Sequence, residues 1–381
     1  MLTFNPDFAR RVHAVGESKT TRVFAQANEL RRQGKQIISL AVGEPDFDTP
    51  DPVIAATQRA LADQQTRYGA VAGLEDLRAR LATGFPSYGP ENIIVTNGAK
   101  QALFSLFQAI CDPGDEIILP QPCWVSFTEQ IKLAGGRPVA VDTADHQLDP
   151  QAILAAVTPR TRAILINSPN NPTGAVYAQD ALAAVARIAE AHRLYVISDE
   201  AYHAFVYDDR RHVPMCEVMP DPRQVITVRS FSKHYNMTGF RLGYVAADEA
   251  VIRALTKLQS HLCGNVCTFA QHGALAALEM DQAIVEQRRA VLQRRRDLAF
   301  DLACRLFDCV KPQGAFYLFA DVSRHLHKDE SSAALALRLL DRAGVAVVPG
   351  EAFGGPGRIR ISFGTGETEL RTAFQKIKEV L

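Results

Sequence analysis

The sequence has no excess of charge of either sign, because 42 lysines and arginines balance 42 aspartates and glutamates. A protein that binds nucleic acid normally has a basic excess gathered on one face. The basic runs here, such as Arg294-Arg295-Arg296, are short and interleaved with acidic residues. We therefore predict no nucleic-acid partner, and such arginines are typical of a solvated helix face.

Long apolar runs are also missing. No stretch approaches the roughly 20 residues that a helix needs to cross a bilayer, and the first residues, Met1 to Pro6, lack the basic and then apolar order of a secretory signal. We therefore expect no membrane partner and a cytoplasmic location.

The sequence has few cysteines for its length. There are seven, odd in number and scattered over positions 111, 123, 216, 263, 267, 304 and 309. In a chain this long, such a pattern favours reduced thiols over a disulfide scaffold. Cys263 and Cys267 are four residues apart, but no second pair of metal ligands lies near them in the sequence. We therefore predict no metal site.

The sequence does contain enough apolar side chain for a large core, because 47% of its 381 residues are hydrophobic. Short apolar runs alternate with amphipathic stretches through the middle of the chain, and residues 179–192 have helical periodicity. This pattern is typical of strands buried on both faces of a mostly parallel sheet covered by helices. We therefore predict an α/β fold, with strands at 92–96, 116–119, 163–167, 194–198 and 225–228.

Chemically interesting side chains follow these apolar runs. Lys100 comes after the first, Asn171 after the third, Asp199 after the fourth and Lys233 after the last. Ligands bind at the carboxyl ends of the strands in such sheets. The positions therefore predict one shared site at that edge.

After about residue 285 the pattern changes. A long charged helix is followed by strands around 315–318 and 359–362 and by a terminal helix. This order is typical of a smaller α+β domain.

One lysine has unusual neighbours. Ser230 and Ser232 precede Lys233, and Arg241 follows it by eight positions. A lysine beside another cation and shielded from water has a lowered pKa, so its amine can attack an aldehyde and form a Schiff base. Hydroxyls and a guanidinium suit a phosphate. Together these groups fit pyridoxal phosphate, although Lys233 taken alone is typical of a solvated loop.

Two further turns suit the same ligand. Gly98 and Lys100 open a helical stretch after a strand, where free amides favour an anion, although a plain turn is the alternative. Asp199 ends another strand, three places before Tyr202. A carboxylate beside the pyridine nitrogen would keep it protonated, so that the ring could accept electrons. An ordinary helix N-cap is the alternative for Asp199.

The segment from Ser230 to Tyr244 resembles the lysine signature of the class I and II pyridoxal-phosphate aminotransferases, in register at both serines, the lysine, the arginine and two glycines. The segment from Asn167 to Gly174 resembles that family's asparagine-proline-glycine turn, and similar matches extend from about residue 34 to 362. The resemblance implies the fold type I of these transferases. It places a large domain at 46–285 and a small α+β domain at 1–45 and 286–381.

The resemblance also implies a role for each matched residue. Lys233 would bind the cofactor covalently and carry a proton, Asp199 would pair with the ring nitrogen, and Tyr202 would donate to the phenolic oxygen. The implied cofactor contacts also include Gly98, Ala99, Lys100, Trp124, Asn171, Ser230, Ser232 and Arg241.

On the substrate side, the resemblance implies contacts from Gly43, Lys100, Trp124 and Asn171, and a bidentate grip by Arg360 on the α-carboxylate. Arg358 would be its exposed neighbour. Trp124 would stack on the cofactor ring, whereas its sequence context alone favours core packing.

A homodimer with shared active sites is implied by Tyr68. The segment Thr66-Arg67-Tyr68-Gly69 resembles the one whose tyrosine reaches the phosphate in the neighbouring subunit. An ordinary surface tyrosine is the alternative.

The implied reaction is ping-pong amino transfer from an amino acid to a 2-oxo acid such as 2-oxoglutarate. The sequence is most similar to bacterial aspartate aminotransferases that lack the usual side-chain-binding arginine, in which Lys100 and hydroxyls matching Ser18 and Thr20 would bind the distal carboxylate. The neighbouring Glu17, Lys19 and Arg22 depart from that pattern.

Other functions on this fold remain as alternatives. Aromatic amino acids, including kynurenine, and methionine or alanine are alternative substrates, and lyase and oxidase reactions use the same fold. A cofactor-binding sensor without turnover would need a DNA-binding segment, and the stretch ahead of Gly43 is short for one.

Overall fold

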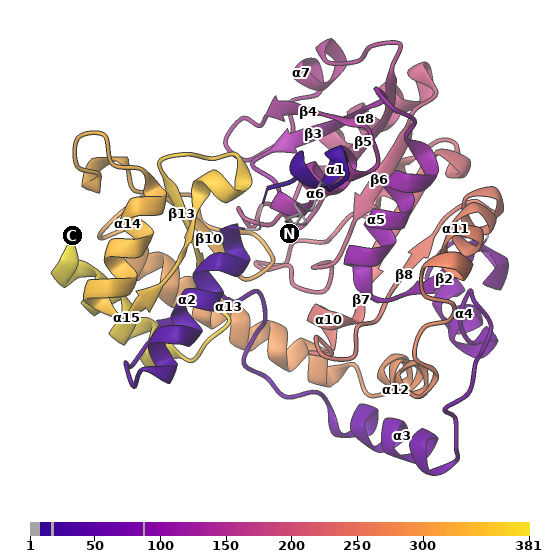
Figure 1. Cartoon of the computed structure of the whole chain (residues 1–381), viewed down its shortest axis with the longest axis horizontal. Coiled ribbons are helices and arrows are strands. Elements are labelled where there is room, and N and C mark those ends of the chain that lie inside the picture. Colours follow the sequence, from indigo (N-terminus) through magenta and orange to yellow (C-terminus); the bar gives the residue numbers. More distant parts are fainter. Residues whose placement is uncertain (1–7, 17–18, 87) are drawn as a thin grey trace, which may run out of the picture.

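A seven-stranded sheet forms the centre of the computed structural model, which describes residues 8–16, 19–86 and 88–381 (Figure 1). Its order is β2-β8-β7-β6-β5-β3-β4, and β8 alone runs antiparallel to its neighbours. The strands are β2 (Ile93–Thr96), β3 (Glu116–Gln121), β4 (Arg137–Asp142), β5 (Thr161–Asn167), β6 (Tyr195–Asp199), β7 (Val225–Ser230) and β8 (Gly243–Ala246).

Both faces of this sheet are buried because successive strand side chains point to opposite sides. In β3, Ile117 and Leu119 pack on one face and Ile118 packs on the other. The first face is covered by α5 (Gly98–Ile110), α6 (Val125–Leu133) and α11 (Glu249–Leu262). The second is covered by α7 (Pro150–Ala155), α8 (Gln179–His192) and α9 (Met215–Val218), and beside β2 and β8 by α3 (Asp51–Ala62), α4 (Glu75–Ala82) and α12 (Thr268–Glu279).

Helix α8 begins and ends where its periodicity predicts. Leu182, Val185, Ala186 and Ala189 recur at intervals of three and four residues, and all four are buried against the sheet. The helix stops at Arg193, which adopts the left-handed conformation of a C-cap, with φ of 56°.

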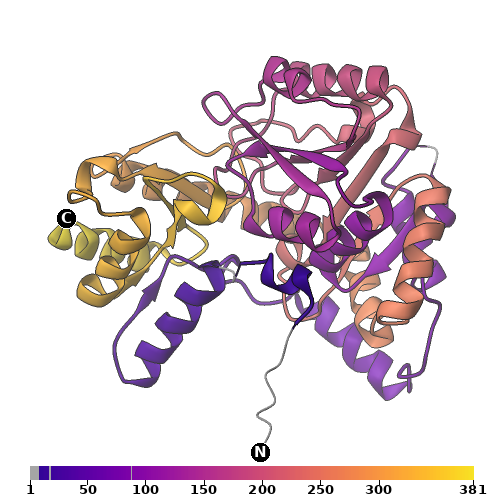
Figure 2. The ribbon, with the colours of Figure 1, turned by 45° about the horizontal axis from the view of Figure 1, so that its top comes forward.

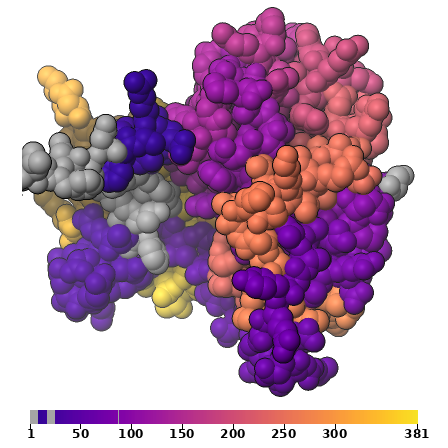
Figure 3. Space-filling model, turned by 45° about the vertical axis from the view of Figure 1, so that its right-hand side comes forward, coloured from indigo at the N-terminus to yellow at the C-terminus, as the bar shows by residue number. Residues whose placement is uncertain are grey.

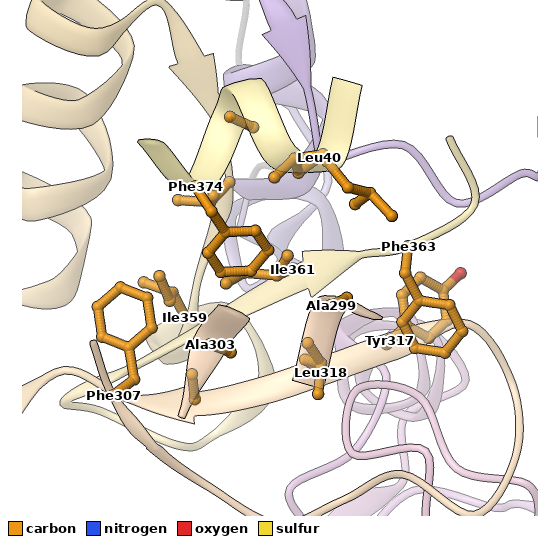
Figure 4. Packing of buried hydrophobic residues seen from close by; sticks show 14 of the residues in the cluster. Leu40, Ala299, Ala303, Phe307, Tyr317, Leu318, Ile359, Ile361, Phe363 and Phe374 are labelled. Carbon is orange, nitrogen blue, oxygen red and sulfur yellow. The ribbon is translucent and has the colours of Figure 1, made fainter. Parts of the chain in front are cut away.

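A second, antiparallel sheet lies beside the first, as Figure 2 shows in orange and yellow. It has the order β12 (Val348–Pro349), β13 (Arg358–Ser362), β10 (Tyr317–Asp321) and β9 (Asp308–Cys309). Its core packs against α13 (Ala283–Ala303), α14 (Ser332–Arg338) and α15 (Glu367–Val380). Figure 4 shows Leu318, Ile361 and Phe374 meeting Ala299 and Ala303 of α13 in this core.

The start of the chain contacts both parts. Helix α2 (Lys19–Arg32) lies against β11 and β12, and β1 (Ile38–Ser39) pairs with β11 (Val345–Ala346). Helix α1 (Arg10–His13) packs instead on α6. The domain division at residues 45 and 285 stays a prediction.

The predicted α/β fold is confirmed, and each of the five strands predicted for its sheet is present. Two strands of this seven-stranded sheet, β4 and β8, were not predicted. Strand β4 is at the sheet edge and half exposed, so it lacks a continuous apolar run. Strand β8 has only four residues, and its first two belong to the segment from Ser230 to Tyr244. Among the residues described, no helix has the length and apolar character needed to span a bilayer.

Candidate active site

A cavity of about 290 Å³ opens at the carboxyl edge of the large sheet. The loops after β2, β3, β5, β6 and β7 all reach it, as expected where parallel strands end together. Twelve of the predicted site residues line it: Gly43, Ala99, Lys100, Trp124, Asn171, Asp199, Tyr202, Ser230, Ser232, Lys233, Arg241 and Arg360.

Lys233 lies on the short helix α10 (Phe231–His234), directly after β7. The Ser230 side chain caps this helix by accepting a hydrogen bond of 3.1 Å from the Ser232 amide. The Lys233 amine donates to the Gly43 carbonyl. Burial, and then the nearby cations Arg360 and Arg241, lower the pKa of Lys233 to about 8. Roughly a tenth of this amine is therefore neutral and nucleophilic at pH 7, far more than for an ordinary lysine.

One end of the cavity is suited to an anion. Helix α5 begins at Gly98, where φ is +78°, and its first amides are free of intrahelical partners. The Arg241 guanidinium lies so near that a Cβ on Gly98 would be 2.8 Å from its Nη2 atom. Ser230 and Ser232 add two hydroxyls. Gly98 thus supports this end of the cavity without lining it.

The Asp199 carboxyl is at the end of β6. Its Oδ1 atom accepts a hydrogen bond of 3.1 Å from the Ala201 amide. Burial, with a smaller contribution from Glu200, raises the pKa of Asp199 to about 7, and no cation within the described part of the chain offsets this. A bound cationic nitrogen would favour the ionised carboxylate at this position.

Arg360 reaches the cavity from β13 of the second sheet. Its Nη1 donates to Asn171 Oδ1 at 3.0 Å and its Nη2 donates to the Ala41 carbonyl at 2.7 Å. The guanidinium lies between the rings of Tyr317 and Phe353, 4.3 and 5.1 Å from their centroids. Its buried Nε atom has no hydrogen-bond partner among the residues that the structure describes. This arginine is therefore held in place with a free donor, as binding of a carboxylate requires.

Tyr317 lines the cavity although no sequence motif singles it out. Its hydroxyl is 3.0 Å from the hydroxyl of Tyr202. Burial raises the pKa of both phenols, so both remain protonated at neutral pH. Asn167 was also not predicted as a site residue. Its side-chain Nδ2 donates to the Asp199 backbone carbonyl at 3.1 Å, and its side-chain Oδ1 accepts from the Asn171 backbone amide at 2.9 Å.

A buried ion pair lies behind the site. Glu200 Oε2 accepts hydrogen bonds from Arg229 Nε and Nη2 at 2.9 and 2.8 Å. Burial alone would raise the pKa of Glu200, but Arg229 and His212 outweigh it and hold that pKa well below its usual range. Because Glu200 follows Asp199 and Arg229 precedes Ser230, the pair fixes two loops relative to each other. The sequence gives no sign of this pairing.

Tyr68 and Arg358 do not line the cavity. Tyr68 is 98% exposed, as a residue that acts in a second subunit would be. Ser18 lies outside the described residues, as does the side chain of Thr20. Arg358 is half exposed beside Asp321, away from the cavity lining.

An open, mostly parallel sheet with a buried amine, an acid and an arginine at its carboxyl edge defines an α/β enzyme of the fold type I transferase class. Residues 35–377 match the sequence profile of the family described as aminotransferase class I and II. The chain is 44% identical to the aspartate/prephenate aminotransferase of Thermus thermophilus and 42% identical to the probable aspartate/prephenate aminotransferase of Aquifex aeolicus, over 98% of this chain and of each relative.

The solved structures agree with the sequence relatives. The aspartate aminotransferase of Thermus thermophilus with maleate superposes with a TM-score of 0.94 at 43% identity, over 99% of this chain and all of that one. The chain belongs to the aminotransferase class I and II family and is an aminotransferase. Enzymes of this family depend on pyridoxal phosphate.

Proposed function

We propose that this aminotransferase holds pyridoxal phosphate in the cavity at the carboxyl edge of the large sheet. The cavity residues fit that cofactor at three points. The α5 start, Arg241 and the serine hydroxyls would receive the phosphate, Asp199 would receive the ring nitrogen, and the Lys233 amine would bind the aldehyde. The observation that carries the proposal is the half-buried Lys233 amine, which shares one cavity with Asp199 and Arg360. Among the described residues, the Asp199 carboxyl has no cationic partner and the Arg360 Nε atom has no hydrogen-bond partner.

When bound, the cofactor withdraws electrons from the Cα–H bond of the amino acid. The chain supplies the proton transfer and the positioning. The neutral Lys233 amine, once free of the cofactor, would take the proton from Cα and deliver it to the carbon that was the aldehyde carbon of the cofactor. Asp199, ionised by a cationic partner, would keep the ring nitrogen protonated, while Tyr202 would donate a hydrogen bond to the phenolic oxygen.

The substrate we propose is aspartate, with 2-oxoglutarate as the accepting oxo acid. Arg360, oriented by Asn171, would bind the α-carboxylate in a bidentate fork. Lys100 would bind the distal carboxylate, since its amine lies 5.1 Å from the Trp124 ring on the cavity wall. Aspartate is the substrate common to the names of the relatives, and one was solved with maleate, another dicarboxylate.

Trapping with borohydride tests this proposal without relying on turnover. The purified chain is incubated with pyridoxal phosphate, reduced and digested, and the modified lysine is identified by mass spectrometry. We expect the label on Lys233. Because the neutral amine is the nucleophile and its pKa is about 8, the rate of capture should rise as pH increases from 6 to above 8.

Two variants complete this test. Lys233→Ala should lose the label and nearly all amino transfer, whereas Lys257→Ala, at an exposed helix position, should keep both. A wild-type protein labelled elsewhere, or a Lys233→Ala variant with full activity, would show that the cofactor site is wrongly assigned. Conversion of aspartate measured beside aromatic donors, methionine and alanine then tests the substrate separately.

A further inference from the structure

Two cysteines that the cavity does not use lie in contact at the edge of the second sheet. Cys304 caps the carboxyl end of α13 and donates its amide to the Phe300 carbonyl at 2.9 Å. Cys309 is in β9, the edge strand of that sheet. The two sulfur atoms are 3.7 Å apart, so the thiols are in van der Waals contact.

The backbone between the two cysteines holds this contact in place. The Ala303 carbonyl accepts hydrogen bonds from the amides of Leu306 and Phe307, at 2.9 and 2.8 Å. Phe307 is buried in the core of the second sheet, where Figure 4 shows it near Ala303 and Ile359. At the other end, Cys309 pairs in register with Ala320 of β10. The thiols therefore meet because both ends of a tight turn are anchored.

The two thiols differ in their access to solvent. Cys304 is exposed, whereas Cys309 is partly buried. Burial, and then the neighbouring Cys304, raise the pKa of Cys309 to about 12. The thiolate is the attacking species in exchange with disulfides. Cys304 is thus the thiol that a reagent in solution reaches first, and Cys309 is placed to respond.

We propose that Cys304 and Cys309 form a thiol–disulfide exchange site that takes small disulfides of the glutathione type. The Cys304 thiolate attacks one sulfur of the small disulfide, forming a mixed disulfide and releasing one small thiol. Cys309 then loses its proton and attacks Cys304 Sγ, which closes the Cys304–Cys309 bond and releases the second small thiol. The two protein thiols are oxidised, the small disulfide is reduced, and the two protons leave on the released thiols.

Little movement separates the contact from the bond. A disulfide joins sulfurs about 2.0 Å apart. The present separation is 3.7 Å, and rotation about a single side-chain bond can move a sulfur atom far enough to close the difference. The anchored backbone keeps the two cysteines close, and the exposed side chain of Cys304 has room to rotate toward Cys309. Neither cysteine lines the active-site cavity, so this site does not depend on the proposed cofactor.

Mass spectrometry of the full-length chain tests the site. The reduced protein is incubated with glutathione disulfide, alkylated and digested with trypsin. Cleavage after Arg296, Arg305 and Arg324 places the cysteines in separate peptides, 297–305 and 306–324, because the Lys311-Pro312 bond resists trypsin. We expect these two peptides to be joined, with the loss of two hydrogens, and more rapidly as pH rises.

Single serine variants establish the order of events. Cys309→Ser should stop at a glutathione adduct on Cys304, and Cys304→Ser should form neither the adduct nor the bridge. Cys263→Ser removes the other exposed cysteine as a matched control and should still form the bridge. Two free thiols after incubation, a lasting adduct on Cys304 in the wild type, or a bridge to any other cysteine would overturn the proposal.

Discussion

At the scale of single residues, the contact between Tyr202 and Tyr317 joins the two sheets at the cavity wall. Tyr202 follows β6 of the large sheet and Tyr317 begins β10 of the small one. Their hydroxyls are 3.0 Å apart, and Arg360 lies over the Tyr317 ring. We infer that Tyr317 orients the Tyr202 hydroxyl toward the phenolic oxygen of the cofactor and that its ring supports the arginine.

Replacing Tyr317 with phenylalanine separates these two contributions. The ring remains under Arg360, so substrate affinity should change little, but the hydrogen bond to Tyr202 is lost. A hydrogen bond of this kind contributes about 1 kcal/mol, so kcat should fall roughly fivefold. Steady-state kinetics with aspartate as donor would measure kcat and KM separately.

A double-mutant cycle with Tyr202→Phe provides the control. If the hydroxyls act together, the double variant should lose little more than Tyr202→Phe alone. Additive losses would mean that Tyr317 acts independently of Tyr202. An unchanged kcat in Tyr317→Phe would contradict the inference directly.

The residues that sequence could predict are those with local signals. Lys233, Asp199 and Gly98 each follow an apolar run and have distinctive neighbours, so their motifs indicate the site before the fold is known. The sequence around Tyr317 indicates only that this residue belongs to a strand. The pair of Glu200 and Arg229 bridges 29 positions, and only the parallel pairing of β6 with β7 brings these side chains together. Long-range contacts of this kind have no local pattern.

At the scale of elements, the anion-binding end depends on a close approach of β8 to the start of α5. Strand β8 begins at Gly243, where a Cβ would be 2.6 Å from the Ala99 nitrogen and 2.9 Å from the Arg229 carbonyl. Such distances leave no room for a side chain. The glycine therefore determines where the first amides of α5 lie relative to Arg241.

Gly243→Ala should displace the start of α5. We expect the cofactor-free protein to lose about 1–3 kcal/mol of unfolding free energy from overpacking, and the dissociation constant of pyridoxal phosphate to rise roughly tenfold as the free amides move. Urea unfolding of the cofactor-free protein and a cofactor titration would measure the two effects independently.

Gly239 supplies the matched control for this element. It lies in the same segment, yet a Cβ there meets nothing within 4 Å. Gly239→Ala should therefore leave cofactor affinity unchanged. Equal losses in the two alanine variants would mean that the segment tolerates no side chain in general, and that the approach of β8 to α5 is not the cause.

Strand β8 also shows a limit of predicting secondary-structure elements from the sequence. The five predicted strands have apolar runs that are buried on both faces, whereas β8 has four residues and begins with a glycine. Its antiparallel direction comes from the turn through Arg241, which has a positive φ of 56°. The sequence motif indicates that Arg241 and Gly243 matter, but the strand itself appears only when β2 and β7 are placed on either side.

At the scale of the whole molecule, the exposed side chain of Tyr68 marks one face of the protein. The carbonyl of the preceding Arg67 accepts a hydrogen bond of 3.1 Å from Thr268 at the start of α12, next to α11. Leu61, at the end of α3, and Leu262, at the end of α11, are also exposed. Figure 3 shows these regions in purple and orange, side by side on that face. We propose that it is the dimer interface and that Tyr68 completes the active site of the partner.

Subunit mixing tests the shared site. In a heterodimer of Lys233→Ala and Tyr68→Ala subunits, the Tyr68→Ala subunit keeps its own Lys233 and receives an intact tyrosine from its partner. One of the two sites is then complete, so activity should reach about half that of the wild type. Differently tagged subunits, expressed together and purified through both tags, would provide this species.

The matched control pairs a wild-type subunit with a Lys233→Ala/Tyr68→Ala double variant, which carries the same substitutions but leaves no complete site. If Tyr68 acted within its own subunit, the control would be the active species and the mixed heterodimer the inactive one; a monomer in sedimentation would contradict the shared site altogether.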